Sequence, residues 1–120
     1  NQLFNWGSLF DVDPPSSADD IPKKSLDYWV RSNEYALKTA RRVFDERHLV
    51  VCFEHLCRQP REALAELVDF LELDASSEQL ERLAAIPELP SSVGRFRHHE
   101  RGQFSEDQLG RVKALGFPIE

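Results

Sequence analysis

The sequence of 120 residues contains no methionine, two cysteines, five glycines and no long apolar run. A membrane-spanning helix needs roughly 20 consecutive apolar residues, so no segment is predicted to be one. No basic-then-apolar leader opens the chain, and Cys52 and Cys57 are too few for the disulfide framework of a small secreted domain. These absences favour the cytoplasm as the compartment. A chain that begins at Asn1 and has no methionine is expected to be a processed product or an excised piece.

An excess of basic residues is also lacking. The chain has 15 Lys and Arg against 21 Asp and Glu, a net charge of −6, whereas nucleic-acid binding needs a basic face that displaces counterions from phosphates. We therefore expect neither a nucleic acid nor a membrane as partner. One segment departs from this balance, because residues 91–103 hold three arginines, two histidines and a single acidic residue. Such a stretch in an acidic protein suits the binding of one small anion.

The two cysteines and the nearby histidines do not predict a metal centre. His48 and His55 lie close to Cys52 and Cys57 in sequence, but their spacing does not match a zinc site. Cys52 also falls inside an apolar run, and buried free cysteines commonly act as small hydrophobic side chains. We assign no metal ligand.

Residues 1–24 mix large apolar side chains with prolines and small polar residues. These interrupt any regular period, which predicts an irregular segment with short turns. The aromatic content is too high for a disordered tail, so the apolar side chains are expected to pack against something. We divide the chain into this irregular segment, 1–24, and a helical region, 25–120.

Four helices are predicted in the helical region, over 26–46, 60–72, 77–86 and 106–115. The apolar residues of the first recur at three- and four-residue steps and form one stripe. The residues that begin or end these helices are Ser25 (N-cap), Pro60, the capping boxes Ser76-x-x-Gln79 and Ser105-x-x-Gln108, and Gly116.

Asn33 is a polar residue on the apolar stripe of the first predicted helix. Two interpretations are open. Its amide can bond a neighbouring backbone group, or it can face a ligand cleft. The first is the commoner fate of such a residue and is the one that we expect.

The run Leu49–Phe53 is apolar and rich in β-branched residues. A continuous run of this kind is typical of a strand buried on both faces of a parallel sheet in an α/β protein. One strand cannot pair with itself, so we expect the rest of its sheet to lie elsewhere. An unpaired strand edge would also offer a route to self-association. The predicted fold class is mainly α with one short strand.

The residues that follow this strand carry a family resemblance. Residues 50–60 read VVCFEHLCRQP, Ala63-Leu64 follow, and residues 69–73 read DFLEL. This pattern resembles the C-terminal part of sulfotransferases that use 3′-phosphoadenosine 5′-phosphosulfate, most of all the bacterial and tyrosylprotein enzymes. In that family a buried strand leads into an aromatic-Glu-Asp-Leu turn, then a helix that starts at proline and ends in a Phe-Leu-Gly-Leu-like pattern.

The resemblance covers roughly residues 26–117, since boundaries predicted from sequence carry errors of a few residues. The sequence departs from the family at His55, where Asp is usual, and at Glu72, where Gly is common. The resemblance implies that the chain is the C-terminal part of a P-loop-like α/β sulfotransferase fold. The complete enzyme would transfer a sulfuryl group to a hydroxyl or amine.

The segment 90–97, PSSVGRFR, is the second part of the resemblance. In the family a small residue, a basic residue and an aromatic residue lie here, on a loop that closes over the nucleotide. The resemblance therefore implies that Arg95 binds the cofactor, with Gly94 and Ser92 as companions. A guanidinium can bind phosphate oxygens in pairs, glycine lets the backbone approach closely, and a serine hydroxyl can donate a hydrogen bond. Spacing alone would equally fit a solvated loop with ordinary surface arginines.

No catalytic residue is assigned. Glu54 follows the predicted strand and could act as a general base, but the family pattern makes it a structural residue that holds the next loop. None of the four histidines matches a catalytic position of the family. The sequence has no Gly-x-x-Gly-x-Lys-like turn to cradle the phosphosulfate. The chain by itself is therefore expected to be inactive.

Two other functions remain open at this point. The chain could be a non-enzymatic helical module whose apolar side chains at residues 3–10 dock a protein partner. It could also be a small-anion binding domain that works through residues 91–101.

Overall fold

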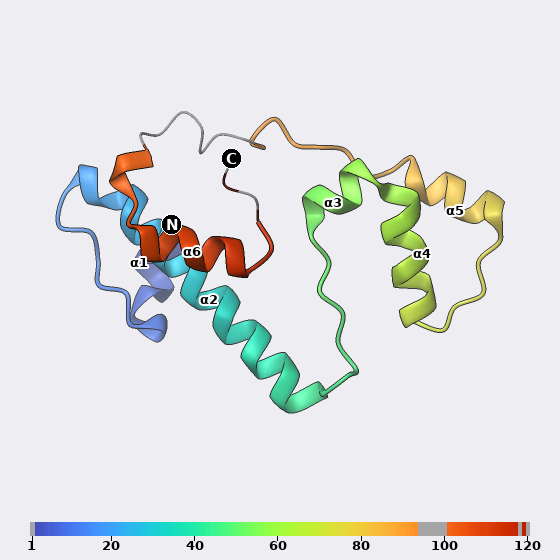
Figure 1. The fold of residues 1–120 in the computed structure, drawn as a ribbon, viewed down its shortest axis with the longest axis horizontal. Helices are drawn as coiled ribbons and strands as arrows, with labels where there is room; N and C mark the ends of the chain where they lie inside the picture. Colours follow the sequence, from blue (N-terminus) through green and yellow to red (C-terminus); the bar gives the residue numbers. More distant parts are fainter. Residues whose placement is uncertain (1, 94–100, 118, 120) are drawn as a thin grey trace. The chain divides into compact units, whose positions relative to one another are not determined.

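The computed structural model describes residues 2–93, 101–117 and 119 (Figure 1). Helices make up 66% of the described residues, so the mainly α class is confirmed. The chain divides into two compact units, unit 1 with residues 1–46 and 97–120, and unit 2 with residues 47–96. Among the described residues, no helix is both long and apolar enough to cross a membrane.

Unit 1 is organised around one long helix. Its elements are α1 (Gln2–Trp6), the 3-10 helices η1 (Gly7–Phe10) and η2 (Ala18–Asp20), α2 (Ile21–Phe44), the 3-10 helix η4 (Arg101–Gln103), and α6 (Glu106–Ala114). The long helix α2 contacts α1, η1, η2 and α6. Residues from both ends of the sequence therefore meet on α2 (Figure 1).

The prediction that 1–24 is irregular is wrong for much of this segment, because α1, η1, η2 and the first turn of α2 lie in it. The start of α2 was also expected too late. The helix begins at Ile21, with Asp20 as N-cap, and Ser25 lies inside it. The sequence interpretation treats Pro22 as a helix breaker. In the first turn of a helix, however, a missing N–H costs nothing and the fixed φ of proline already suits the helix.

The core of unit 1 is small. Its buried apolar side chains, with their exposed fractions, are Leu3 (3%), Val12 (4%), Val30 (1%) and Val112 (8%). They come from α1, the turn after η1, α2 and α6, so the core collects the segments that contact α2. The apolar stripe of α2 is covered only in part, since Val43 near its C-terminal end remains 53% exposed.

The predicted strand Leu49–Phe53 is absent. Residues 48–52 lie in neither a helix nor a strand, and Phe53 begins α3 (Phe53–Arg58). A strand needs a second strand for its hydrogen bonds, and the part of the chain that the structure describes contains no other. The backbone of Cys52 is nonetheless extended, with φ −79° and ψ 118°.

Unit 2 consists of helices that bury few apolar side chains. After α3 come α4 (Pro60–Phe70), which starts at the predicted proline, and α5 (Ser77–Ala84), which starts with the predicted capping box. Ala63 is the buried apolar residue of this unit's described part. Large apolar side chains remain exposed on it: Val50, Val51, Phe53, Phe70, Leu71, Leu73, Leu83, Ile86 and Leu89.

The C-terminus of α6 is closed by a Schellman motif, in which two hydrogen bonds reach back over the last turn. The N–H of Phe117 donates to the carbonyl of Val112 (3.3 Å), and that of Gly116 to the carbonyl of Lys113 (2.9 Å). Gly116 has φ +90°. The prediction that Gly116 ends this helix is confirmed.

The C-terminus of α4 has the same motif with a different residue. The N–H of Leu73 donates to the carbonyl of Val68 (3.0 Å), and that of Glu72 to the carbonyl of Asp69 (3.0 Å). Glu72 has φ +52°, a conformation in which the Cβ of an L-residue costs roughly 1–2 kcal/mol. A glutamate therefore stands where the backbone favours glycine.

Glu72→Gly is expected to raise the free energy of unfolding by about 1 kcal/mol, since relief of the positive φ outweighs the greater chain entropy of unfolded glycine. Gly116→Ala should lower it by a similar amount, because a Cβ there meets no atom of the described residues within 4 Å and the positive φ is what penalises it. Urea unfolding followed by circular dichroism measures both. Glu72→Ala is the control, because it removes the carboxylate and keeps the Cβ. If it stabilises as much as Glu72→Gly, backbone strain is not the cause.

Candidate functional site

Of the three residues predicted to bind a nucleotide, one, Ser92, lies among the residues that the structure describes. Ser92 is exposed and lies in a turn over residues 91–93, where the N–H of Val93 donates to the carbonyl of Pro90 (3.0 Å). Gly94 and Arg95 lie outside the described residues.

Glu54 sits in the first turn of α3, where a carboxylate is favoured by the partial positive charge of the helix N-terminus. It is half-buried, and its Oε2 accepts a hydrogen bond from the Sγ of Cys52 (3.5 Å). This contact links the end of the extended segment to the start of α3. Among the described residues, no group of three or more His, Cys, Asp or Glu side chains could hold a metal ion.

Asn33 bonds the backbone of its own helix. Its Nδ2 donates to the carbonyl of Trp29 at 2.7 Å. The interpretation of Asn33 as a residue bonded to a neighbouring backbone group is confirmed.

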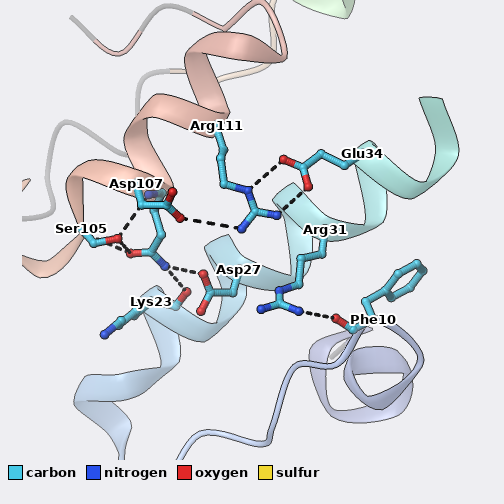
Figure 2. Close-up of polar contacts among 9 residues, drawn as sticks. Phe10, Lys23, Asp27, Arg31, Glu34, Ser105, Asp107 and Arg111 are labelled. Atoms are coloured by element: carbon cyan, nitrogen blue, oxygen red, sulfur yellow. Dashed lines mark hydrogen bonds and ion pairs between the residues drawn. The ribbon is translucent and has the colours of Figure 1, made fainter. Parts of the chain in front are cut away.

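The densest set of polar contacts joins α2 and α6 (Figure 2). We call it the α2–α6 polar cluster. Its members are Lys23, Asp27 and Glu34 on α2, with Ser105, Asp107, Gln108 and Arg111 at the start of α6 and within it. These residues are far apart in sequence.

Gln108 lies at the centre of the cluster and is 3% exposed. Its Oε1 accepts from the backbone N–H of Ser105 (2.9 Å), which is half of the predicted capping box. Its Nε2 donates to Asp27 Oδ1 (2.6 Å) and to the carbonyl of Lys23 (3.2 Å). One side chain therefore caps α6 and also holds it against α2.

Arg111 and Glu34 form a two-pronged ion pair between the same helices. Arg111 Nε lies 2.8 Å from Glu34 Oε1 and Nη2 lies 2.5 Å from Oε2, while Asp107 Oδ2 is 4.0 Å from Nη1. The hydrogen bonds from Arg111 hold the pKa of Glu34 below its usual value, and those to Glu34 raise the pKa of Arg111. Because the pKa of Glu34 is depressed, the pair stabilises the fold above the unfolded-state pKa, and this contribution is lost as the pH falls through the folded-state value.

Arg31 ties α2 to the N-terminal segment. Its Nη1 donates to the carbonyl of Phe10 (3.4 Å), as Figure 2 shows. The ring of Phe10 meets the rings of Tyr28 and Tyr35 edge to face, with centroids 5.6 and 5.8 Å apart. Within the described residues, Arg31 Nε is buried and has no hydrogen-bond partner.

A shallow apolar hollow of about 440 Å³ lies on unit 1. It is lined by Ile21, Pro22, Ser25, Leu26, Trp29 and Phe104. None of the described residues that line it is charged, so these residues offer no acid, base or phosphate ligand. Beside it, the ring of Trp29 packs edge to face against Phe117, 5.0 Å between centroids.

The cluster was not predicted from the sequence. The capping box identifies Ser105 and Gln108, but nothing local indicates that Gln108 pairs with Asp27 or that Arg111 pairs with Glu34. A signal does exist in the spacing, since Asp27, Arg31 and Glu34 recur at helical steps beside the apolar stripe. Such a row is more often a solvated face.

The geometry of the cluster is that of a helix–helix contact. Asp27 bonds Gln108 and Glu34 bonds Arg111 across the two helices, whereas the side chain of Asp107 is 80% exposed. Comparisons of the chain with protein-family models, with curated proteins and with solved structures gave no significant match.

Proposed function

We propose that this chain is the C-terminal helical part of a sulfotransferase that uses 3′-phosphoadenosine 5′-phosphosulfate, and that it supplies one wall of the nucleotide site. The complete enzyme transfers the sulfuryl group to a hydroxyl or amine acceptor. Arg95 contacts a phosphate of the nucleotide, and Gly94 and Ser92 assist. Arg97 and Arg101 add positive potential.

The observation that carries this proposal is the uncovered apolar segment that leads into α3. Residues 48–52 form no helix, Cys52 is extended, and Val50 and Val51 are 62% and 44% exposed. β-branched side chains of this kind are typical of strands inside a covered sheet. A sheet supplied by another part of the enzyme would pair this backbone and cover these side chains.

The end of α4 adds independent support. The family pattern commonly has glycine at the position of Glu72, and Glu72 adopts φ +52° as C′ residue of a Schellman motif. A glycine preference is what such a backbone conformation produces. The local geometry therefore agrees with the family pattern even where the residue type departs from it.

Titration of the complete enzyme with adenosine 3′,5′-bisphosphate, followed by two-dimensional NMR, tests the proposal, because this chain by itself supplies one wall of the site. We expect backbone amides within 91–101 to shift in a saturable manner. Arg95→Ala should weaken binding by roughly tenfold or more, because a charge-assisted pair contributes about 1.5–3 kcal/mol and 1.4 kcal/mol is one decade. Arg95→Lys should recover part of the loss, since an ammonium keeps the charge without the two-pronged geometry.

Arg101→Ala is the matched control, and its effect should be much smaller if Arg101 adds only general potential. Equal affinity of the Arg95→Ala variant and the unchanged complete enzyme would contradict the assignment of Arg95. Absence of any shift within 91–101 would contradict the nucleotide site as a whole.

A specific observation also supports a second candidate function, that of a protein-interaction module. In α1 and η1, Phe4, Trp6 and Leu9 are 56%, 53% and 69% exposed, although the neighbouring Leu3 is buried. Three large apolar side chains on one short segment are suited to docking a partner. This function predicts that the bisphosphate causes no shift of the backbone amides within 91–101. It also predicts that Trp6→Ala abolishes partner binding.

A further inference from the structure

We propose that α6 forms and docks onto α2 as one event, because the buried amide of Gln108 belongs both to the N-cap of α6 and to its contact with α2. The helix would then have two states. It is either capped, helical and docked, or uncapped, unfolded and released.

The first argument is the geometry of the amide. Gln108 Oε1 accepts from Ser105 N–H at 2.9 Å, and Nε2 donates to Asp27 Oδ1 at 2.6 Å. The two atoms belong to one rigid planar group, so binding at one end orients the other. Because Gln108 is 3% exposed, either end left without a partner would be a buried unsatisfied group, which is costly.

The second argument is the weakness of α6 on its own. The helix has nine residues and contains Gly110. Isolated helices shorter than roughly 12–15 residues are marginal in water, and an interior glycine lowers helix stability further. Its helical state therefore depends on its contacts with the rest of unit 1. These bury its own Val112 and include the Arg111–Glu34 pair.

The chain contains a matched control for this role. The helix α5 opens with the same capping box, in which Ser76 N–H donates to Gln79 Oε1 at 2.7 Å. That box is exposed, and within the described part of the chain the hydrogen bonds of Gln79 are those of the cap alone. Glutamate is as good as glutamine at this position of a capping box. Gln→Glu should therefore preserve both caps and disturb only the contacts that Gln108 Nε2 makes with α2, at Asp27 and at the carbonyl of Lys23.

The test uses the full chain at pH 7 and follows amide hydrogen exchange by NMR. In Gln108→Glu a carboxylate faces that of Asp27, and we expect the amides of residues 109–115 to lose protection together, by about tenfold or more. Gln79→Glu should leave the protection of α5 unchanged. The double variant Gln108→Glu/Asp27→Asn should regain much of the protection, because the asparagine amide can donate to the new carboxylate.

Three results would overturn the proposal. The first is that the amides of α6 stay protected in Gln108→Glu although the Trp29–Phe117 ring contact is lost. The helix would then form without docking. Another is an equal effect of Gln108→Glu and Gln79→Glu on their own helices. The third is failure of Asp27→Asn to restore protection, since the contact with α2 would then not be the cause. Amides of α4, in unit 2, serve as the internal reference if Gln108→Glu unfolds unit 1 altogether.

Discussion

Val30→Asp is expected to lower the free energy of unfolding of unit 1 by about 3 kcal/mol or more, because it buries an unpaired charge. Val30 lies on α2 and is 1% exposed, the most buried large side chain of the described residues. The core around it is small, so losing the apolar packing of Val30 removes much of the stabilisation that keeps α1 and α6 on α2.

The control is the same substitution on the same helix. Val43 also belongs to the apolar stripe of α2 but is 53% exposed, so a carboxylate there keeps its hydration. Val43→Asp should cost less than about 1 kcal/mol, mainly through an acidic charge near the helix C-terminus. Urea unfolding monitored by tryptophan fluorescence makes the comparison, because both tryptophans, Trp6 and Trp29, belong to unit 1. Equal midpoints for the two variants would mean that the core is not where the structure places it.

Gly7→Ala is the second substitution with a large expected effect. A Cβ on Gly7 would lie 2.9 Å from the carbonyl oxygen of Val12 and 3.3 Å from Leu3 Cδ1. Both neighbours are buried, and the N–H of Val12 is itself bonded to the carbonyl of Gly7 at 3.0 Å. The backbone cannot yield without breaking this turn, so we expect a loss of about 1–3 kcal/mol, the usual cost of overpacking a core.

Gly102→Ala serves as its control, since a Cβ on Gly102 would meet no atom of the described residues within 4 Å. It should change the free energy of unfolding by no more than about 0.5 kcal/mol. The same fluorescence-monitored urea unfolding applies. A Gly7→Ala variant as stable as the unchanged chain would show that α1 and η1 do not pack against Val12 in solution.

Local sequence signals predicted the helices well because the forces that start and end a helix act within a few residues. Pro60, the boxes at Ser76 and Ser105, and Gly116 all mark helix ends in the structure. Pro22 was misinterpreted because proline both breaks a helix interior and suits a first turn. The sequence around it does not say which applies.

The candidate site was less predictable. Asn33 could be interpreted correctly because its partner, the Trp29 carbonyl, lies one turn away. The partners of Gln108 could not, since Asp27 and the carbonyl of Lys23 are reached only after the chain has returned to α2. The assignments of Arg95 and Gly94 lie outside the described residues and stay predictions, and that of Ser92 rests on the family resemblance.

The sequence by itself determined the mainly helical class, the caps and the apolar stripe of α2, because helix hydrogen bonds and helix periodicity are local. Only the tertiary structure decided which part of that stripe is buried and that α6 is held by Gln108 and Arg111. It also decided that Leu49–Phe53 is not a strand. An apolar β-branched run specifies a preference, but a strand exists only where another strand satisfies its backbone, and none of the described residues does so.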